Sequence, residues 1–300
     1  MKIGAIVPQG WVGEFDGWEP LAAWRRTTEV AREAERLGFE SIWLFDHFHT
    51  TPRPTDEITF ESFTALAALA ALTSHVRLGH VVICTAFRNP ALTAKMISTM
   101  DSISGGRMEL GIGAGWKQDE WLAYGYGFPG TKERLARLAD DLEVNTRMLE
   151  GDKNRHATFE GAHSRVRDAR NVPKPIQRPR VPIMIGGNGP NVTWRLAARY
   201  ADELNLDGLT PAETAAALPV IASRCEEVGR DPSTLPVSVH LMREPLRPTG
   251  APRIELLAGY ADLGVSRVMG LNLDTARTDE ALIALAEDAR AAGVEIHPTG

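Results

Sequence analysis

Cysteine is nearly absent from this 300-residue chain. Its two cysteines, Cys84 and Cys225, are far apart and lack the spacing of a metal-binding motif. Because Cys84 lies in an apolar stretch, we expect it to be a buried packing residue, in keeping with a reducing cytoplasm.

Long hydrophobic runs are missing too. No apolar run is long enough to span a bilayer. Residues 1–10 pass directly into strand-like sequence, without an apolar region of signal-peptide length. These absences predict a cytoplasmic protein with no membrane partner.

Several catalytic signatures do not occur. The chain has no GxSxG elbow, no HExxH pair and no dinucleotide-binding glycine fingerprint after its first predicted strand. Asp46, His47 and His49 are neighbours but share no regular element, so we expect no metal site. Acidic residues outnumber basic ones by 39 to 33, and the net charge of -6 argues against nucleic acid as a partner.

The residues that are present alternate between short apolar runs and helical patterns. The apolar runs are continuous rather than alternating, which is typical of parallel strands that are covered on both faces. A helix that ends in glycine precedes several of them, as at Gly38, Gly105 and Gly264, and the same ending recurs at Gly293. The predicted strands are 3–7, 41–45, 77–84, 107–112, 181–185, 203–206, 236–241 and 267–271.

Eight strands separated by helices favour a (β/α)8 TIM barrel over a doubly wound sheet. We expect one domain over residues 1–300. Residues 151–180 interrupt the pattern, because they contain few apolar residues, several basic ones and three prolines. We interpret them as an insertion after the fourth β/α unit.

In a barrel of this kind the active site lies where the strands end. Polar or glycine-rich residues follow each predicted strand. They are Gln9; Asp46, His47 and His49; Thr85, Arg88 and Asn89; Ala114, Trp116 and Lys117; Gly186, Gly187, Asn188 and Gly189; Asn205 and Asp207; His240 and Arg243; and Asn272.

His47 is the strongest candidate among them for acid–base chemistry, because an imidazole gains or loses a proton near neutral pH. The alternative is that Asp46 caps a turn and His47 is a surface residue. The glycines at 186–189 precede a helix and offer free backbone N–H groups to a phosphate, to which Asn188 and Asn191 would add donors. The alternative there is a tight turn that needs glycine only for its backbone.

Two further features could belong either to a ligand site or to ordinary packing. The glycine-spaced strand exit at 111–115 lets something flat or anionic approach the backbone, or serves packing alone. Trp11, Phe15 and Trp18 follow the first strand and form either a lid over a ligand or an ordinary aromatic cluster.

Four blocks of the sequence resemble the luciferase-like flavin and deazaflavin oxidoreductases, most closely the branch that uses the deazaflavin coenzyme F420. These blocks are SIWLFDHF (41–48), RLGHVVICTAFRNPALTAK (77–95), DSISGGRMELGIGAGW (101–116) and VPIMIGGNGP (181–190). The resemblance covers nearly the whole chain. It implies a (β/α)8 barrel with an insertion, a homodimer and F420 as the cofactor.

The resemblance also implies roles for particular residues. His47 and Asp46 would contact the deazaflavin, and a non-proline cis peptide at Val81–Val82 would form a bulge behind its ring. Further ring contacts would fall on Gly113, Ala114 and Gly115. The phosphate and linker contacts would fall on Gly186, Gly187, Asn188, Gly189, Pro190 and Asn191.

The chain also departs from the family's sugar-phosphate dehydrogenase. That enzyme has a glutamate where this chain has Trp116, and a tryptophan where it has Thr51. Sugar-phosphate oxidation is therefore not expected. The apolar Trp11, Trp18 and Trp116 predict a flatter and less polar substrate, and the predicted substrate pocket consists of Trp11, Thr51 and Trp116.

The resulting hypothesis is an oxidoreductase that transfers a hydride between C5 of F420 and a small organic substrate, with His47 as the proton donor or acceptor. One alternative is an FMN-dependent monooxygenase supplied by a separate flavin reductase; a reductase for F420 is the corresponding partner of the first hypothesis. Another is a flavin-binding barrel without catalysis. The basic segment 151–180, with Arg88 and Lys95, either contacts the oligoglutamate tail of F420 or is ordinary surface charge.

Overall fold

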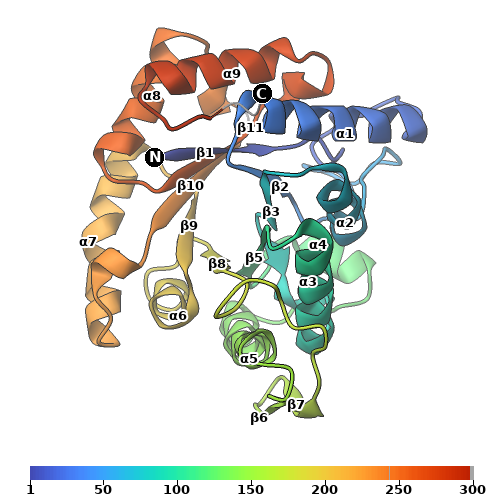
Figure 1. Ribbon diagram of the computed structural model, residues 1–300, viewed down its shortest axis with the longest axis vertical. Helices are drawn as coiled ribbons and strands as arrows, with labels where there is room; N and C mark the ends of the chain where they lie inside the picture. Colours follow the sequence, from blue (N-terminus) through green and yellow to red (C-terminus); the bar gives the residue numbers. More distant parts are fainter. Residues whose placement is uncertain (243, 298–300) are drawn as a thin grey trace.

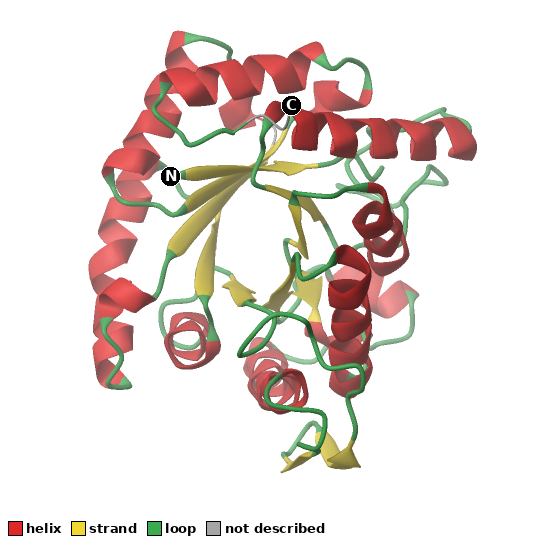
Figure 2. Cartoon of the chain, viewed as in Figure 1, coloured by secondary structure: helices red, strands yellow, loops and turns green. Residues whose placement is uncertain are grey.

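The computed structural model describes residues 1–242 and 244–297, and it has a closed parallel barrel surrounded by helices (Figures 1 and 2). The prediction of a (β/α)8 barrel is confirmed. Around the barrel the strands follow the order β3-β2-β1-β11-β10-β9-β8-β5, and β3 pairs with β5 to close it. The strand bounds are β1 Lys2–Ile6, β2 Ser41–Leu44, β3 Arg77–His80, β4 Ile83–Cys84, β5 Met108–Gly113, β8 Ile183–Gly186, β9 Glu203–Asp207, β10 Val237–Met242 and β11 Arg267–Leu271.

The helices form the outer layer (Figure 2). Their bounds are α1 Pro20–Leu37, α2 Ser62–Leu72, α3 Pro90–Ser104, α4 Gln118–Ala123, α5 Thr131–Leu149, α6 Thr193–Tyr200, α7 Pro211–Glu227, α8 Ala251–Asp262 and α9 Glu280–Ala291. Short 3-10 turns cover Thr85–Phe87, Pro232–Thr234, Glu244–Leu246 and Leu273–Ala276. No helix within the described residues is long and apolar enough to cross a membrane.

Local sequence explains where several helices begin and end. α3 starts at Pro90, whose missing N–H is not needed in the first turn, and the Asn89 side chain accepts a hydrogen bond from the backbone of Ala91. It ends at Gly105, which has φ of 70°, a conformation that glycine adopts without a Cβ clash. α7 begins with a capping box between Thr210 and Glu213. The short helix α4 was not expected from the sequence.

The third predicted strand is not continuous. Residues 77–84 divide into β3 and β4, and the Val81–Val82 peptide bond between them is cis, as the resemblance implies. Beyond this point β4 pairs with β5, and Ile83 lies opposite Ile112. The single strand expected over 77–84 is therefore corrected to two short strands on either side of a bulge.

Apolar residues fill both the barrel and the layer between its strands and helices. Trp43 is fully buried inside the barrel. A Cβ atom built on Gly79 would lie 2.3 Å from the Trp43 ring, so glycine at this position makes room for the indole. The larger cluster lies between strands and helices, and its members include Ile42 and Leu66.

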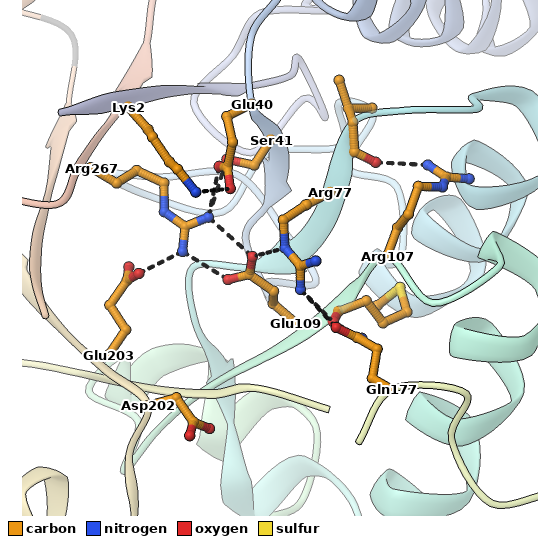
Figure 3. A network of polar contacts seen from close by, with 12 residues as sticks. Lys2, Glu40, Ser41, Arg77, Arg107, Glu109, Gln177, Asp202, Glu203 and Arg267 are labelled. Carbon is orange, nitrogen blue, oxygen red and sulfur yellow. Dashed lines mark hydrogen bonds and ion pairs between the residues drawn. The ribbon is translucent and has the colours of Figure 1, made fainter. Parts of the chain in front are cut away.

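The end of the barrel where the strands begin is closed by a polar network (Figure 3). The guanidinium of Arg267, from the start of β11, bonds to the carboxylates of Glu40 at 2.9 Å, Glu109 at 2.8 Å and Glu203 at 2.7 Å. Arg77 bonds to the same Glu109 carboxylate from the other side. A network at this end contributes to stability rather than to the site, since active sites of barrels lie at the opposite end.

Residues 151–180 contain an antiparallel hairpin of β6 (Ala157–Glu160) and β7 (Arg165–Ala169), which projects beyond α5 (Figure 1). Lys174 is largely buried and donates to the carbonyls of Met148 and Glu150 at the end of α5. The Lys95 ammonium donates to the carbonyl of Val172. The ammonium groups of these two lysines therefore already donate hydrogen bonds to backbone carbonyls of the protein.

Candidate functional site

A cavity of about 630 Å³ opens where the strands end. Residues from the β3–β4 bulge, β5, β8, β9 and β10 line it, together with the segments that follow β1, β2 and β5. The predicted site residues in its wall are Trp11, Asp46, His47, Thr51, Val81, Val82, Gly113, Ala114, Gly115, Trp116, Gly186 and Gly187. Asn188, Gly189, Pro190 and Asn191 are not part of the wall.

His47 lies in this wall between an aromatic ring and a carboxylate. Its ring stacks on Trp11, with centroids 4.0 Å apart and planes 6° apart. Its Nδ1 is 2.8 Å from Oε2 of Glu120 in α4. His47 is thus held in one orientation at the cavity, and the alternative of an unconstrained surface histidine is wrong.

The Asp46 carboxylate is bonded to the protein itself. It is buried and accepts hydrogen bonds from the Cys84 backbone at 2.9 Å, from Ser62 at 2.9 Å and from two nitrogens of Arg88 at 2.8 and 3.0 Å. Asp46 therefore joins the end of β2 to β4 and α2, while a cofactor contact by Asp46 stays a prediction. Arg88 also bonds to Glu61, so its charge is already paired within the protein.

Three residues at the ends of β9 and β10 form a second polar group in the same wall. His240 has its Nδ1 2.7 Å from Asn205 Oδ1 and its Nε2 3.1 Å from Asp207 Oδ1. The bond from His240 lowers the pKa of the Asp207 carboxyl. The Asn205 amide in turn donates to Ser238 at 2.9 Å inside the barrel. Arg243, also predicted at this end of β10, lies outside the described residues.

The glycine turn after β8 divides into two parts. Gly186 and Gly187 face the cavity, and a Cβ atom on Gly186 would lie 2.8 Å from Val82, as would one on Gly113. Glycine at both positions lets the bulge and the two strand ends form one close-packed wall. Asn188 uses its side-chain amide to bond both the N–H and the carbonyl of Asp207, so it is not free to bind a phosphate in this arrangement.

The remaining strand-end candidates have structural roles. Gln9 bonds to the backbone of Phe45 and Phe60, Asn272 accepts from Asp274 at the start of a 3-10 turn, and Thr85 donates to Asp141. His49 is buried with Nδ1 on the carbonyl of Thr50, and Lys117 is paired with Asp119 although it lines the cavity. Among the aromatics of the first loop, Trp11 lines the cavity, whereas Phe15 and Trp18 pack on each other in a separate cluster.

Sequence reasoning missed several residues of the wall, including Val12, Pro52, Cys84, Glu120, Trp121, Thr193 and Met242. Burial raises the pKa of the Cys84 thiol to about 12, so Cys84 is not a thiolate nucleophile. Nothing in the sequence around Glu120 marked it, because its partner His47 is 73 positions away. Within the described part of the chain, no group of three or more His, Cys, Asp and Glu side chains is arranged to hold a metal ion.

Comparisons with known proteins agree with this architecture. Residues 6–243 match the family described as luciferase-like monooxygenase. The F420-dependent glucose-6-phosphate dehydrogenase of Kineococcus radiotolerans is 35% identical over 178 residues, which are 59% of this chain and 50% of that protein. The enzyme of the same name from Intrasporangium calvum is 32% identical over 68% of this chain and 61% of its own length. This chain thus spans roughly half to three fifths of these relatives.

Further matches extend over more of the chain. An uncharacterised protein of Mycobacterium tuberculosis is 28% identical over 80% of this chain and 84% of its own length. An F420-dependent secondary alcohol dehydrogenase, solved with an F420–acetone adduct, superposes with a TM-score of 0.80 at 20% identity over 97% of this chain and 98% of its own. The F420-dependent tetrahydromethanopterin reductase of Methanopyrus kandleri gives 0.63 at 21% identity, over 99% and 83%.

At such identities the two solved structures establish the fold alone. The family match runs from the last residue of β1 to just past the end of β10 and includes the strand ends that line the cavity. The chain therefore belongs to the luciferase-like monooxygenase family.

Proposed function

We propose that this protein is an F420-dependent oxidoreductase that transfers a hydride between C5 of the deazaflavin and a small organic substrate. The observation that carries the proposal is the position of His47, which lines a cavity whose wall also contains Val81, Val82 and the glycines of β5 and β8. The names of the two dehydrogenases, at 35% and 32% identity, support the choice of cofactor.

The cavity fits a flat, largely apolar ring system. Its volume of about 630 Å³ is in the usual range for a cofactor or ligand site. Gly113 and Gly186 present backbone without side chains beside Val82. Trp11 and Trp121 add aromatic surface to the wall, which suits a flat ring.

When bound, the deazaflavin supplies the carbon that accepts or donates the hydride. The chain's own part is to hold the ring against the Val81–Val82 wall, to exclude water, and to move one proton at His47 Nε2. In the oxidising direction His47 accepts the proton of a substrate hydroxyl, and in the reducing direction it donates one to the oxygen that forms. Val82, Gly113, Ala114, Gly115, Gly186 and Gly187 are the proposed ring contacts.

The proposal extends to the substrate pocket and the assembly. Trp11, Thr51 and Trp116 are the proposed substrate contacts, and Trp116 is 64% exposed at the rim, with its ring centroid 6.0 Å from that of His47. A tryptophan here in place of an acid favours a flat, weakly polar substrate over a sugar phosphate. We also propose one domain over residues 1–300 with 151–180 as an insertion, and a homodimer.

Titration of the purified protein with oxidised F420 and, separately, with FMN, followed by fluorescence, tests the cofactor. Tighter binding of F420 is expected. Preference for FMN, with NADPH consumption that requires a flavin reductase and oxygen, would replace the proposal with a monooxygenase. Tight F420 binding without hydride exchange under any reductant would leave a binding protein without catalysis.

Replacement of His47 by alanine tests the proton-transfer role. Loss of a general acid–base group is expected to lower kcat by about 10²- to 10⁴-fold, while F420 affinity changes little. Replacement of the exposed His163 in the hairpin region is the matched control and should leave kcat unchanged. A His47→Ala protein with full turnover would remove His47 from the mechanism.

A further inference from the structure

The residue that contacts His47, Glu120, lies fully buried in the short helix α4. One carboxylate oxygen, Oε1, accepts the backbone N–H of Phe48 at 2.7 Å and lies 3.4 Å from the backbone nitrogen of His49. The other oxygen, Oε2, lies 2.8 Å from His47 Nδ1. The two oxygens thus have separate partners in the segment that carries His47.

With Glu120 as a carboxylate, this arrangement fixes which nitrogen of His47 carries the proton. An ionised carboxylate only accepts hydrogen bonds, so the 2.8 Å contact requires a proton on Nδ1. In a neutral imidazole Nε2 is then unprotonated. No residue among those that the structure describes is hydrogen-bonded to Nε2, and His47 is part of the cavity wall.

Stacking and hydrogen bonding together leave the ring little freedom. Trp11 covers one face of the imidazole with nearly parallel planes, and Glu120 holds its Nδ1 edge. A histidine that is oriented by a carboxylate on one nitrogen, with the other directed to the reacting atom, is the arrangement that makes an effective base in other enzymes.

We propose that Glu120 is the positioning residue of the active site. It keeps the proton of His47 on Nδ1, so that Nε2 is free to accept a proton from the substrate, and its charge stabilises the imidazolium that then forms. This inference rests on the proposed function for its catalytic consequence, but the position of the proton on His47 is a property of the protein without cofactor.

A glutamine at position 120 separates this role from a purely structural one. Glutamine has nearly the same shape but a single acceptor oxygen, which the Phe48 N–H would occupy as it occupies Oε1 now. The amide NH₂ would then face His47 Nδ1, which must become an acceptor, so the proton would move to Nε2. The segment would stay in place while the base is blocked.

The first measurement is the tautomer of His47 in the cofactor-free protein by ¹⁵N NMR of the imidazole nitrogens, with the His47→Ala protein used to assign its signals among the eight histidines. The wild type is expected to carry its proton on Nδ1, and Glu120→Gln on Nε2. Asp119→Asn is the matched control, because Asp119 precedes Glu120 in the same helix but pairs with Lys117. It should retain the wild-type tautomer.

The second measurement is turnover with F420 and the substrate that is found. Glu120→Gln is expected to lower kcat by about 10²- to 10⁴-fold with F420 affinity within about threefold of wild type. Asp119→Asn should retain wild-type kcat.

The outcomes separate the two proposals. If the wild type does not bind F420 but Glu120→Gln shows the expected change of tautomer, the proposed cofactor is refuted and the positioning role of Glu120 stands. A proton on Nε2 in the wild type would overturn the positioning role even if Glu120→Gln does not fold. An unchanged tautomer or full turnover in a folded Glu120→Gln protein would overturn it as well.

Discussion

Replacement of Arg267 by methionine should destabilise the protein through the carboxylates that it leaves behind. The Arg267 side chain is almost fully buried and contacts the carboxylates of Glu40, Glu109 and Glu203 (Figure 3). Methionine retains an unbranched apolar side chain but no charge. The substitution therefore removes the shared cation from a group of buried anions.

The size of the effect follows from the Glu109 carboxyl. Burial alone would raise its pKa, but the guanidiniums of Arg267 and Arg77 outweigh burial and lower the pKa from 4.5 to about 2. Such a lowering corresponds to about 3 kcal/mol of favourable interaction with the anion. Removal of one partner from a buried ion pair costs about 3–5 kcal/mol in other proteins. For 300 residues this range corresponds to a fall in Tm of about 5–8 °C.

The loss should depend on pH with a defined sign. In the wild type the lowered pKa of Glu109 gives stability that is present above about pH 4.5 and is lost as the pH falls toward 2. Without Arg267, burial should raise the pKa of Glu109 and raise that of Glu203 further, so the folded variant should bind protons more readily than the unfolded chain. Its deficit relative to wild type should be largest near pH 7.5 and smaller near pH 5.

Thermal unfolding followed by circular dichroism at pH 7.5 and pH 5 tests this reasoning. Arg36→Met is the control, since Arg36 forms only an exposed ion pair with Glu33, and its Tm should stay near that of wild type. Adding Glu109→Gln to Arg267→Met should recover part of the lost Tm, because it removes one unpaired anion. An equal loss of Tm at both pH values would refute the electrostatic explanation and leave packing as the cause.

Two other predictions concern the cavity wall. A Cβ atom at Gly115 would lie 2.4 Å from Cys84 Sγ and 2.8 Å from Trp121, so Gly115→Ala should lower Tm and weaken F420 binding. The control is Gly105→Ala, because Gly105 has a similar φ but nothing within 4 Å of the added Cβ atom, so this variant measures the backbone cost alone. Equal losses of Tm in the two variants would contradict the steric clash. Asp46→Asn should lower the free energy of unfolding by about 3 kcal/mol in guanidinium titration, because Arg88 loses a buried partner. An unchanged free energy with weakened F420 binding would instead identify Asp46 as a ligand contact.

The outline of the fold was predictable because it depends on local signals. Continuous apolar runs, glycine after helices and proline at their first turns occur within a few residues of one another, so single segments such as 90–105 contain what α3 needs. The site's position followed from the fold, since parallel strands of one barrel all end on the same side. The division of 77–84 into β3 and β4 was indicated by the resemblance rather than by hydrophobicity.

The partners of individual side chains were decided by closure of the barrel. Asp46 and His47 are adjacent, yet Asp46 bonds to Arg88 and His47 bonds to Glu120, contacts that span 42 and 73 positions. Arg267 is next to Glu109 although 158 positions separate them. The sequence determined which residues reach the strand ends. Only the tertiary structure decided their hydrogen-bond partners, because a hydrogen bond depends on distance and direction between groups that the chain brings together from far apart.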